Sequence, residues 1–316
     1  MEFDLIERIR GCCGSKRADV ALGIGDDAAV LDVPAGRQLV ACTDTLVAGV
    51  HFPEATAPGD IGWKSLAVNL SDLAAMGAEP AWALLALTLP SPDTHFVEGF
   101  AGGFAELARG HAVTLVGGDT TQGPLSVTVT ALGWVPTGSA LTRGGAHPGD
   151  AVYVTGTLGD AAGALQLLRD RERVPQALLA RLQRPRPRIA EGIALRGLAS
   201  ACIDVSDGLL ADLRHVCATS GIAAELDSGS LPISSALAAT FGAETCRELA
   251  LSGGDDYELC ITIPPAREAE LLGAFARTRG EATRIGSIVA GSGVRVLDAR
   301  GDDVTPMRAG WEHFSA

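Results

Sequence analysis

Acidic side chains recur along this chain beside glycines and at the ends of apolar stretches. They are Asp26, Asp27, Asp44, Asp72, Asp119, Asp204 and Asp207. If several of them converge, each pair of carboxylates about 6 Å apart costs roughly 2–3 kcal/mol at an effective dielectric near 20. A convergent cluster therefore requires protons or a divalent cation. All-oxygen ligands without a Cys/His grouping predict Mg²⁺, which in such a site usually accompanies a nucleotide or phosphate.

Each acidic motif also has a simpler explanation when it is taken alone. The GDD of residues 25–27 is typical of a turn, the glycines of GGDTT suit a hairpin, and Ser206 or Asp207 suits a helix N-cap. Neither a turn nor a cap explains Asp44 and Asp204, which interrupt strand patterns. A local rule that is broken inside a strong element favours function at that position.

One helix, predicted over residues 61–80, organises the N-terminal half. Its apolar face carries Leu66, Leu70 and Leu73, and Gly77 with Pro80 is expected to end it. On the other side Ser65, Asn69 and Asp72 follow one another at i, i+4 and i+7, so they line up. This polar stripe is either a solvated face or part of the acidic site.

The remaining pattern predicts alternating strands and helices in two domains, residues 1–137 and 138–316. The N-terminal domain is expected to be α/β and the C-terminal domain α+β. Expected helices cover residues 3–10 and 94–110, and expected strands cover 38–52 and 81–90, with a glycine-broken strand at 20–32 and two strands flanking 117–121. Residues 151–168 and 201–217 each read as a strand followed by a helix, and 251–264 as a glycine–acid turn before a strand.

Two motifs have open alternatives. The glycines of VTGTLGDAAG are spaced GxxGxxxG instead of GxGxxG, which favours a packing turn over phosphate contact. The RPRPR of residues 184–188 is a rigid basic linker that either stops a helix or faces an anion.

Composition excludes several classes of function. The chain has 316 residues, is 47% hydrophobic and carries a net charge of −13, which argues against a general nucleic-acid binder. No apolar run approaches the roughly 20 residues that span a bilayer, and the N-terminus lacks a signal-peptide pattern, so we expect a cytoplasmic protein. The 7 cysteines form no CxxC, which indicates neither a disulfide framework nor a zinc site.

Taken together, the motifs resemble the thiamine-monophosphate kinase family. The resemblance rests on GIGDDAAV, TDTLVAGVHF, AVNLSDLAAMGAEPAWALLALTLP, GGDTTQGP, LTRGGAHPGD, VTGTLGD, IDVSDGL and LSGGDDYEL, which stand in the family's order over nearly the whole chain. It implies a two-domain fold like that of aminoimidazole ribonucleotide synthetase. It also implies a homodimer in which the N-terminal sheets pair, with ATP between the domains.

The resemblance implies direct in-line transfer of the ATP γ-phosphoryl to thiamine monophosphate with several Mg²⁺ ions, giving thiamine diphosphate and ADP. It implies the following metal ligands: Asp27, Cys42, Thr43, Asp44, Asp72, Asp119, Asp204 and Asp207. Nucleotide contacts are expected at Gly118, Asp119, Arg143 and Ser206, and contacts with thiamine monophosphate at His51, Asp255 and Trp311. No covalent nucleophile is expected, and Asp207 and Arg143 are the catalytic candidates because phosphoryl transfer depends on positioning and charge neutralisation.

Two positions depart from the family. Cys42 stands where the family commonly has Ser, which is harmless if the ligand is the main-chain carbonyl and weakens a metal site if it is the hydroxyl. Asp255 stands where the family often has Glu, one methylene longer, so substrate contact there could pass through water.

Two other functions are kept as alternatives. The pair Cys13 and Lys16 in GCCGSK resembles the reactive pair of selenophosphate synthetase. A non-catalytic nucleotide-binding sensor would keep the ATP site without turnover.

Overall fold

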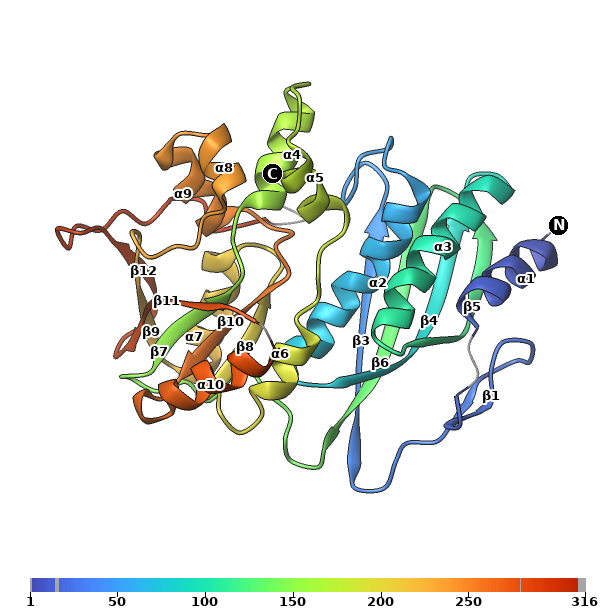
Figure 1. Cartoon of the computed structure of the whole chain (residues 1–316), viewed down its shortest axis with the longest axis horizontal. Coiled ribbons are helices and arrows are strands. Elements are labelled where there is room, and N and C mark those ends of the chain that lie inside the picture. The colour runs from blue at the N-terminus through green and yellow to red at the C-terminus, as the bar shows by residue number, and fades with distance from the viewer. Residues whose placement is uncertain (1, 15–16, 279, 312–316) are drawn as a thin grey trace. The chain divides into compact units, whose positions relative to one another are not determined.

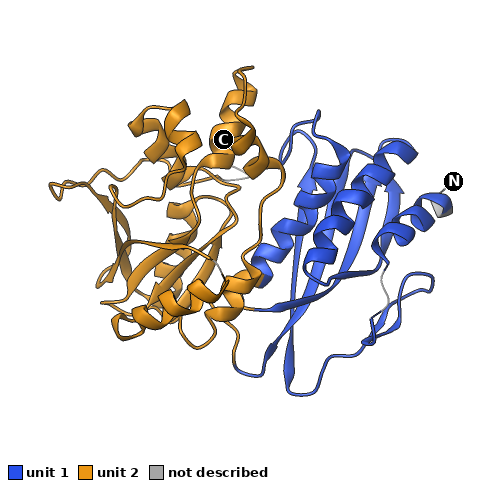
Figure 2. Cartoon of the chain, viewed as in Figure 1, with its two compact units in different colours: residues 1–73, 78–138 blue, residues 74–77, 139–316 orange. Residues whose placement is uncertain are grey.

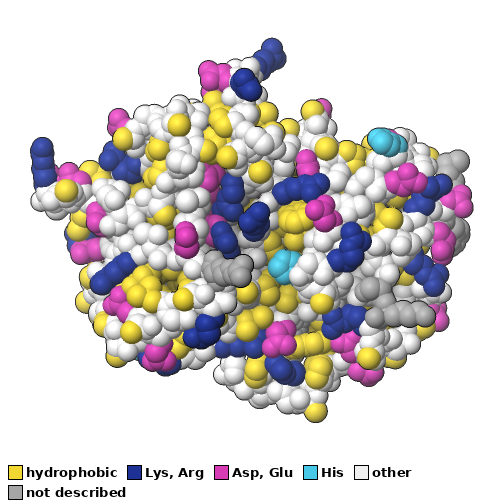
Figure 3. All heavy atoms as spheres, in the orientation of Figure 1, with side chains coloured by type: hydrophobic (Ala, Val, Ile, Leu, Met, Phe, Trp, Pro, Cys, Tyr) yellow, Lys and Arg dark blue, Asp and Glu magenta, His cyan; other side chains and the backbone are white. Residues whose placement is uncertain are grey.

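The chain folds into two compact units, residues 1–73 with 78–138 and residues 74–77 with 139–316 (Figure 2). The structure is a computed structural model that describes residues 2–14, 17–278 and 280–311. The sequence-based domain boundary after residue 137 stays a prediction. In the described residues no helix is long and apolar enough to cross a membrane. On the face drawn in Figure 3, acidic and basic side chains are interspersed with apolar ones.

The first unit is a four-stranded sheet covered on one face by helices (Figure 1). The strand order is β3 (Arg37–Val47), β6 (Ser126–Pro136), β4 (Glu79–Leu89), β5 (Thr114–Gln122). The covering helices are α2 (Pro58–Ala75) and α3 (Thr94–Gly110), and α1 (Glu2–Cys13) packs against α3. The short strands β1 (Val20–Leu22) and β2 (Val30–Leu31) pair separately.

On the other face of this sheet, Val20, Ala29 and Leu31 pack against Trp82 and Trp134 at one end, and the part left open within the described chain carries threonine pairs. The hydroxyls of Thr43 and Thr130 lie 3.0 Å apart, and those of Thr45 and Thr128 lie 2.8 Å apart. Leu84, which shares a row of paired residues with Thr130 and Thr43, is 37% exposed. The same face therefore carries both polar and apolar side chains.

Helix α2 confirms the predicted core helix, with an earlier end. Leu66, Leu70 and Leu73 are each 0% exposed. The helix ends at Ala75 because Gly77 has φ 65° and β4 begins at Glu79. Ser65 and Asn69 are buried as well, so the reading of the polar stripe as a solvated face is wrong.

The second unit is built on a six-stranded mixed sheet. Its order is β12 (Gly293–Leu297), β9 (Ala223–Asp227), β11 (Ala282–Val289), β7 (Ala151–Thr155), β10 (Glu258–Ile263), β8 (Ala201–Val205). Only the β12–β9 pair of this sheet is parallel. The helices are α4 (Asp160–Arg169), α5 (Gln176–Gln183), α6 (Ile189–Ala194), α7 (Leu209–Ser220), α8 (Ser235–Thr240), α9 (Ala243–Ser252) and α10 (Glu268–Thr278), with the short 3₁₀ turn η1 (Pro265–Arg267).

Two local predictions were wrong. Residues 117–121, predicted between two strands, lie inside β5, whose register against β4 shifts between Ala83 and Leu84. The predicted cap at Ser206 or Asp207 is also absent from α7, whose N-cap is Gly208 without a side-chain cap bond. A carboxylate from within the helix replaces that cap, as described below.

Candidate active site

In the first unit, Asp44 of β3 and Asp72 of α2 meet at Cys42. After burial, the charges of Asp72 and Asp44 are the largest causes that raise the pKa of the Cys42 thiol, which indicates that both carboxylates lie near it. Burial raises the pKa of Asp44. The even-numbered face of β3 and the polar stripe of α2 thus bring together two acids that are 28 positions apart in the sequence.

The thiol of Cys42 is bound to the helix and does not act as a free ligand. It donates toward the carbonyl of Asn69 at 3.3 Å. Burial raises the pKa of this thiol well above its ordinary value, and Asp72 and Asp44 add to the shift. Because thiolate, not thiol, is the metal-binding form, any contribution of Cys42 to a magnesium site comes from its main chain.

The structure separates several other residues of the predicted ligand set. The hydroxyl of Thr43 donates to the carbonyl of Val129 on the open face, opposite to Asp44, so only the main chain of Thr43 could join Asp44. Asp119 lies on the edge strand β5, three strand spacings or about 14 Å from β3. Asp27 is exposed and donates its backbone N–H to Asp26 at 2.8 Å.

The backbone alone requires a glycine at position 118, without any ligand. Its φ is 151°, and a Cβ at this position would lie 1.8 Å from the carbonyl oxygen of Leu85. The close approach of β5 to β4 therefore requires glycine here. Gly118 and Asp119 line a small pocket with Ile6 and Ile9 of α1.

His51 is held in one tautomer by its own turn. The backbone N–H of Val47 donates to His51 Nδ1 at 3.0 Å, so the ring proton of a neutral His51 is on Nε2. Lys64, which is 3% exposed, donates to the His51 carbonyl at 3.1 Å. These contacts fix the ring while leaving Nε2 as the donor.

In the second unit, Asp212 organises the loop that contains Ser206 and Asp207. Its Oδ2 accepts the backbone N–H groups of residues 206, 207 and 208 at 3.0, 3.1 and 3.2 Å. Burial, followed by the charges of Asp204 and Asp207, raises the pKa of Asp212 to about 8. The sequence reasoning missed Asp212, although an acid in the first turn of a helix that follows SDG was the available signal.

Asp255 and Trp311 both converge on this loop. The backbone N–H of Asp255 donates to the carbonyl of Ser206 at 2.8 Å, and that of Trp311 donates to the carbonyl of Asp207 at 2.9 Å. A Cβ on Gly254 would lie 2.6 Å from the Ser206 carbonyl, so the approach depends on glycine. Three segments far apart in the sequence thus form one polar site.

The remaining nucleotide candidate, Arg143, is exposed in the segment before β7. Asp204 is 4% exposed in β8. Within the described residues, no three His, Cys, Asp or Glu side chains are grouped closely enough to hold one metal ion. The acids therefore form smaller groups, Asp44 with Asp72 in one unit and Asp204 with Asp207 beside Asp212 in the other.

The two-acid group of the first unit fits Mg²⁺ on its donor chemistry. Mg²⁺ is usually held by one or two carboxylates, with waters and substrate phosphates as the other ligands. Asp44 and Asp72 supply two carboxylates, and burial raises the pKa of Asp44.

Of the two residues behind the selenophosphate alternative, the structure describes Cys13. Cys13 is 5% exposed and donates to the carbonyl of Ala101, and burial raises its thiol pKa to about 12. A thiol with this pKa is a poor nucleophile at neutral pH. Lys16 lies outside the described residues.

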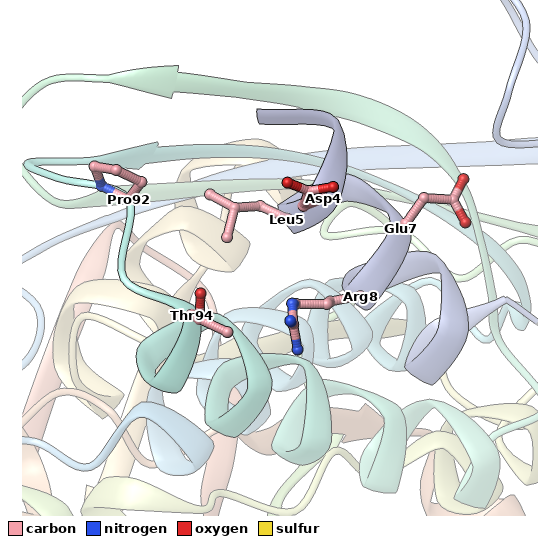
Figure 4. A pocket seen from close by; sticks show the side chains of 6 residues that line it. All are labelled: Asp4, Leu5, Glu7, Arg8, Pro92 and Thr94. Atoms are coloured by element: carbon pink, nitrogen blue, oxygen red, sulfur yellow. The ribbon is translucent and has the colours of Figure 1, made fainter. Parts of the chain in front are cut away.

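A larger pocket lies beside α1, away from these acids. Its volume is about 560 Å³, and Figure 4 shows Arg8 of α1 directed toward the first turns of α3. Arg8 forms an ion pair with Glu98. None of the lining residues (Asp4, Leu5, Glu7, Arg8, Pro92 and Thr94) belongs to the predicted site.

Comparison with known proteins covers both units. Residues 25–135 match the AIR synthase related protein, N-terminal domain, and residues 147–299 match the corresponding C-terminal domain. The thiamine-monophosphate kinase of Escherichia coli K12 is 47% identical over 99% of this chain and 98% of the relative.

Solved structures agree with these matches. The crystal structure of thiamine-monophosphate kinase from Stenotrophomonas maltophilia K279a has a TM-score of 0.88 and 51% identity, covering 93% of this chain and 96% of that one. A structure of AaThiL complexed with AMPPCP and TMP has a TM-score of 0.79 and 35% identity, covering 99% and 97%.

Proposed function

The chain belongs to the thiamine-monophosphate kinases of the AIR synthase-related family, and we propose that it phosphorylates thiamine monophosphate with ATP. An oxygen of the acceptor monophosphate forms a bond to the γ-phosphorus. The bond from that phosphorus to the β,γ-bridging oxygen breaks, and ADP leaves with thiamine diphosphate as the other product. The observation that carries this proposal is the meeting of Asp44 and Asp72 at Cys42, because it provides a carboxylate pair suited to a magnesium–nucleotide substrate. A cytoplasmic location belongs to the same proposal.

Mg²⁺ would be held by Asp44 and Asp72, with main-chain oxygens of residues 42 and 43 nearby. Asp204 and Asp207 form the second acidic group, beside Asp212. When bound, the ion neutralises phosphate charge. Asp27 remains a proposed ligand on an exposed turn, where it could reach an ion together with substrate phosphate. Among the nucleotide contacts, Gly118 and Ser206 would act through their backbones and Arg143 through its guanidinium.

The acceptor side would use His51, Asp255 and Trp311. Because Nδ1 of His51 accepts from Val47, the ring proton of the neutral side chain is on Nε2, which would be the atom that donates to substrate phosphate. Asp255 offers a carboxylate to the cationic thiazolium, and Trp311, 39% exposed, offers a ring face for stacking. These chemistries suit a ligand that carries a positive ring and a phosphate.

A homodimer is part of this proposal and accounts for the position of Asp119. Within one chain Asp119 is about 14 Å from β3, too far to share an ion with Asp44. The open sheet face, with Leu84 and the threonine pairs, offers a surface for a second copy. We propose that this second copy, seated on the threonine face that carries Asp119, brings Asp119 of the partner subunit past the edge strand β3 to the pair Asp44 and Asp72 on the opposite face.

One assay tests the reaction against its alternatives. Purified protein mixed with ATP, Mg²⁺ and thiamine monophosphate should produce thiamine diphosphate and ADP in equal amounts. A protein that binds ATP and yields no thiamine diphosphate would instead be a nucleotide sensor. Loss of all turnover in Cys13→Ser would favour selenophosphate chemistry.

A further inference from the structure

Glu258 is a fully buried acid that the proposed reaction does not use. It is 0% exposed at the start of β10, immediately after the segment 255–257. Arg188 binds both of its oxygens, with Nε to Oε2 and Nη2 to Oε1 each at 2.6 Å. Arg181 Nη2 donates to Oε1 at 2.6 Å, and the Thr155 hydroxyl donates to Oε2 at 2.6 Å.

This network accounts for the basic RPRPR segment. Arg188 is the last residue of that motif, and its partner is an internal carboxylate. Pro185 and Pro187 are buried while Arg186 between them is exposed, which fixes the segment along the unit's surface. The segment therefore follows the end of α5 at Gln183, as a helix stop would, and its last arginine also faces an anion, which belongs to the protein.

The residues just before Glu258 are held in an unfavourable backbone conformation. Asp255 has φ 70° and Tyr257 has φ 52°, both in the left-handed region that residues other than glycine seldom occupy. Such conformations persist only where surrounding contacts impose them. The Tyr257 hydroxyl donates to Asp255 Oδ1 at 2.9 Å, so the two strained residues also hold one another's side chains.

Buried anchors alternate with the strained residues. Asp256 accepts the backbone N–H of Gly159 with both oxygens at 3.0 Å, and Arg181 Nη2 donates to the Asp256 carbonyl at 3.3 Å. Glu258 is the next anchor and joins the same Arg181. On the opposite side, the backbone N–H groups of Asp255 and Tyr257 donate to Ser206 and Val205, each at 2.8 Å.

From these contacts we infer that Glu258, through Arg181 and Arg188, is a positioning residue that holds the Asp255–Tyr257 turn and thereby sets where the Asp255 carboxylate meets the acceptor substrate. The expected change in KM rests on the proposed function. The expected change in the position of the turn is independent of it. Glu258 itself touches neither substrate.

The test compares Glu258→Gln with Glu268→Gln, since each replaces one acid of the same unit with its isosteric amide. Glu268 accepts the hydroxyl of Tyr153 at 2.5 Å and pairs with Arg284. The chain has 2 tyrosines, Tyr153 and Tyr257, so fluorotyrosine-labelled protein gives two fluorine NMR signals that Tyr153→Phe assigns. Glu258→Gln should move the Tyr257 signal, and Glu268→Gln should move the Tyr153 signal alone.

Kinetics provide the second measurement. In Glu258→Gln, KM for thiamine monophosphate should rise about tenfold while KM for ATP stays within about twofold. Glu268→Gln should leave both constants unchanged. An unmoved Tyr257 signal, or an equal rise in both KM values, would reduce Glu258 to a stabilising residue and overturn the inference.

The experiment still decides the inference if the variant does not fold or if the wild-type protein has no kinase activity. If Glu258→Gln does not fold, Arg181→Met keeps the two bonds from Arg188 and should shift the same signal and the same KM by a smaller factor; no shift there overturns the inference. If wild-type protein forms no thiamine diphosphate, the proposed function fails, while the Tyr257 signal still tests the positioning role.

Discussion

At the scale of single residues, Asp72 tests the magnesium site with the least change of shape. Asp72→Asn removes a charge but keeps the volume, so the protein should fold. It should require a higher Mg²⁺ concentration and lose activity by on the order of a hundredfold, because one of two carboxylates is gone. The measurement is the rate as a function of Mg²⁺ concentration. Asp60→Asn, in the first turn of the same helix, is the control, and an unchanged Mg²⁺ requirement in Asp72→Asn would contradict the assignment.

For Cys13 we expect no loss of activity on substitution, in contrast to Asp72. Cys13→Ser should keep full kinase turnover, because the thiol is buried, its pKa is raised to about 12, and its contact is the Ala101 carbonyl. A serine hydroxyl can make the same contact. Steady-state rates of the two proteins at equal concentration check this, and an inactive but folded variant would restore the selenophosphate alternative.

Helical phase was sufficient to predict that Asp72 lines up with Ser65 and Asn69, and the interrupted strand pattern was sufficient to single out Asp44. The sequence could not reveal Asp212, because its role depends on a loop backbone that turns three N–H groups toward one oxygen. For the same reason Glu258 was read as part of a motif and not as the partner of Arg188. Side chains that hold a loop through hydrogen bonds or ion pairs do not recur at helix or strand spacing, so the hydrophobic pattern of the sequence does not reveal them.

At the scale of elements, Asp212 holds the start of α7. Asp212→Ala should lower the free energy of unfolding by about 2 kcal/mol, because three loop N–H groups lose their acceptor. Asp212→Asn keeps an acceptor oxygen and should lose less. Urea unfolding of the three proteins measures the difference, and equal stability of Asp212→Ala and wild type would show that solvent satisfies the loop.

Asp256 predicts a pH dependence in the unit that contains α4. Burial raises its pKa well above the ordinary value, and nearby Glu258 and Asp160 add to this, while the Gly159 N–H and Arg181 oppose it. The native state therefore retains a proton that the unfolded state releases above about pH 4, so this residue lowers stability as pH rises from that value toward its native pKa.

Asp256→Asn removes this dependence and still offers an oxygen to Gly159. Its stability relative to wild type should therefore increase as pH rises from about 4 to 7. Urea unfolding at a series of pH values tests this expectation. A stability difference that does not vary with pH would show that the pKa of Asp256 is the same in the native and unfolded states.

The elements themselves were largely predictable, and the exceptions have local causes. The helices at residues 58–75 and 94–110 follow apolar periodicity. The GGDTT motif was misread because glycines usually mark turns, whereas here Gly118 permits β5 to approach the Leu85 carbonyl. Such an approach depends on the neighbouring strand, which a local pattern does not contain.

At the scale of the whole molecule, the open face of the first sheet is the proposed dimer surface. Leu84→Glu should convert a dimer to a monomer, because it places a charge on the face that a second copy would cover. Leu272→Glu on α10 is the matched control, since Leu272 is 57% exposed in the other unit. Light scattering measures the mass, and a monomeric wild type or a dimeric Leu84→Glu would contradict the proposal.

The position of Asp119 leads to a stricter test of the same dimer. If Asp119 of the partner subunit joins Asp44 and Asp72, Asp119→Asn and Asp72→Asn damage the same shared site from different subunits. Each variant alone should be nearly inactive. Subunits mixed in equal amounts and allowed to exchange should recover about a quarter of wild-type activity, because half of the dimers are mixed and each mixed dimer has one intact site of two. If both residues serve a site within one chain, every subunit in the mixture remains damaged and no activity returns.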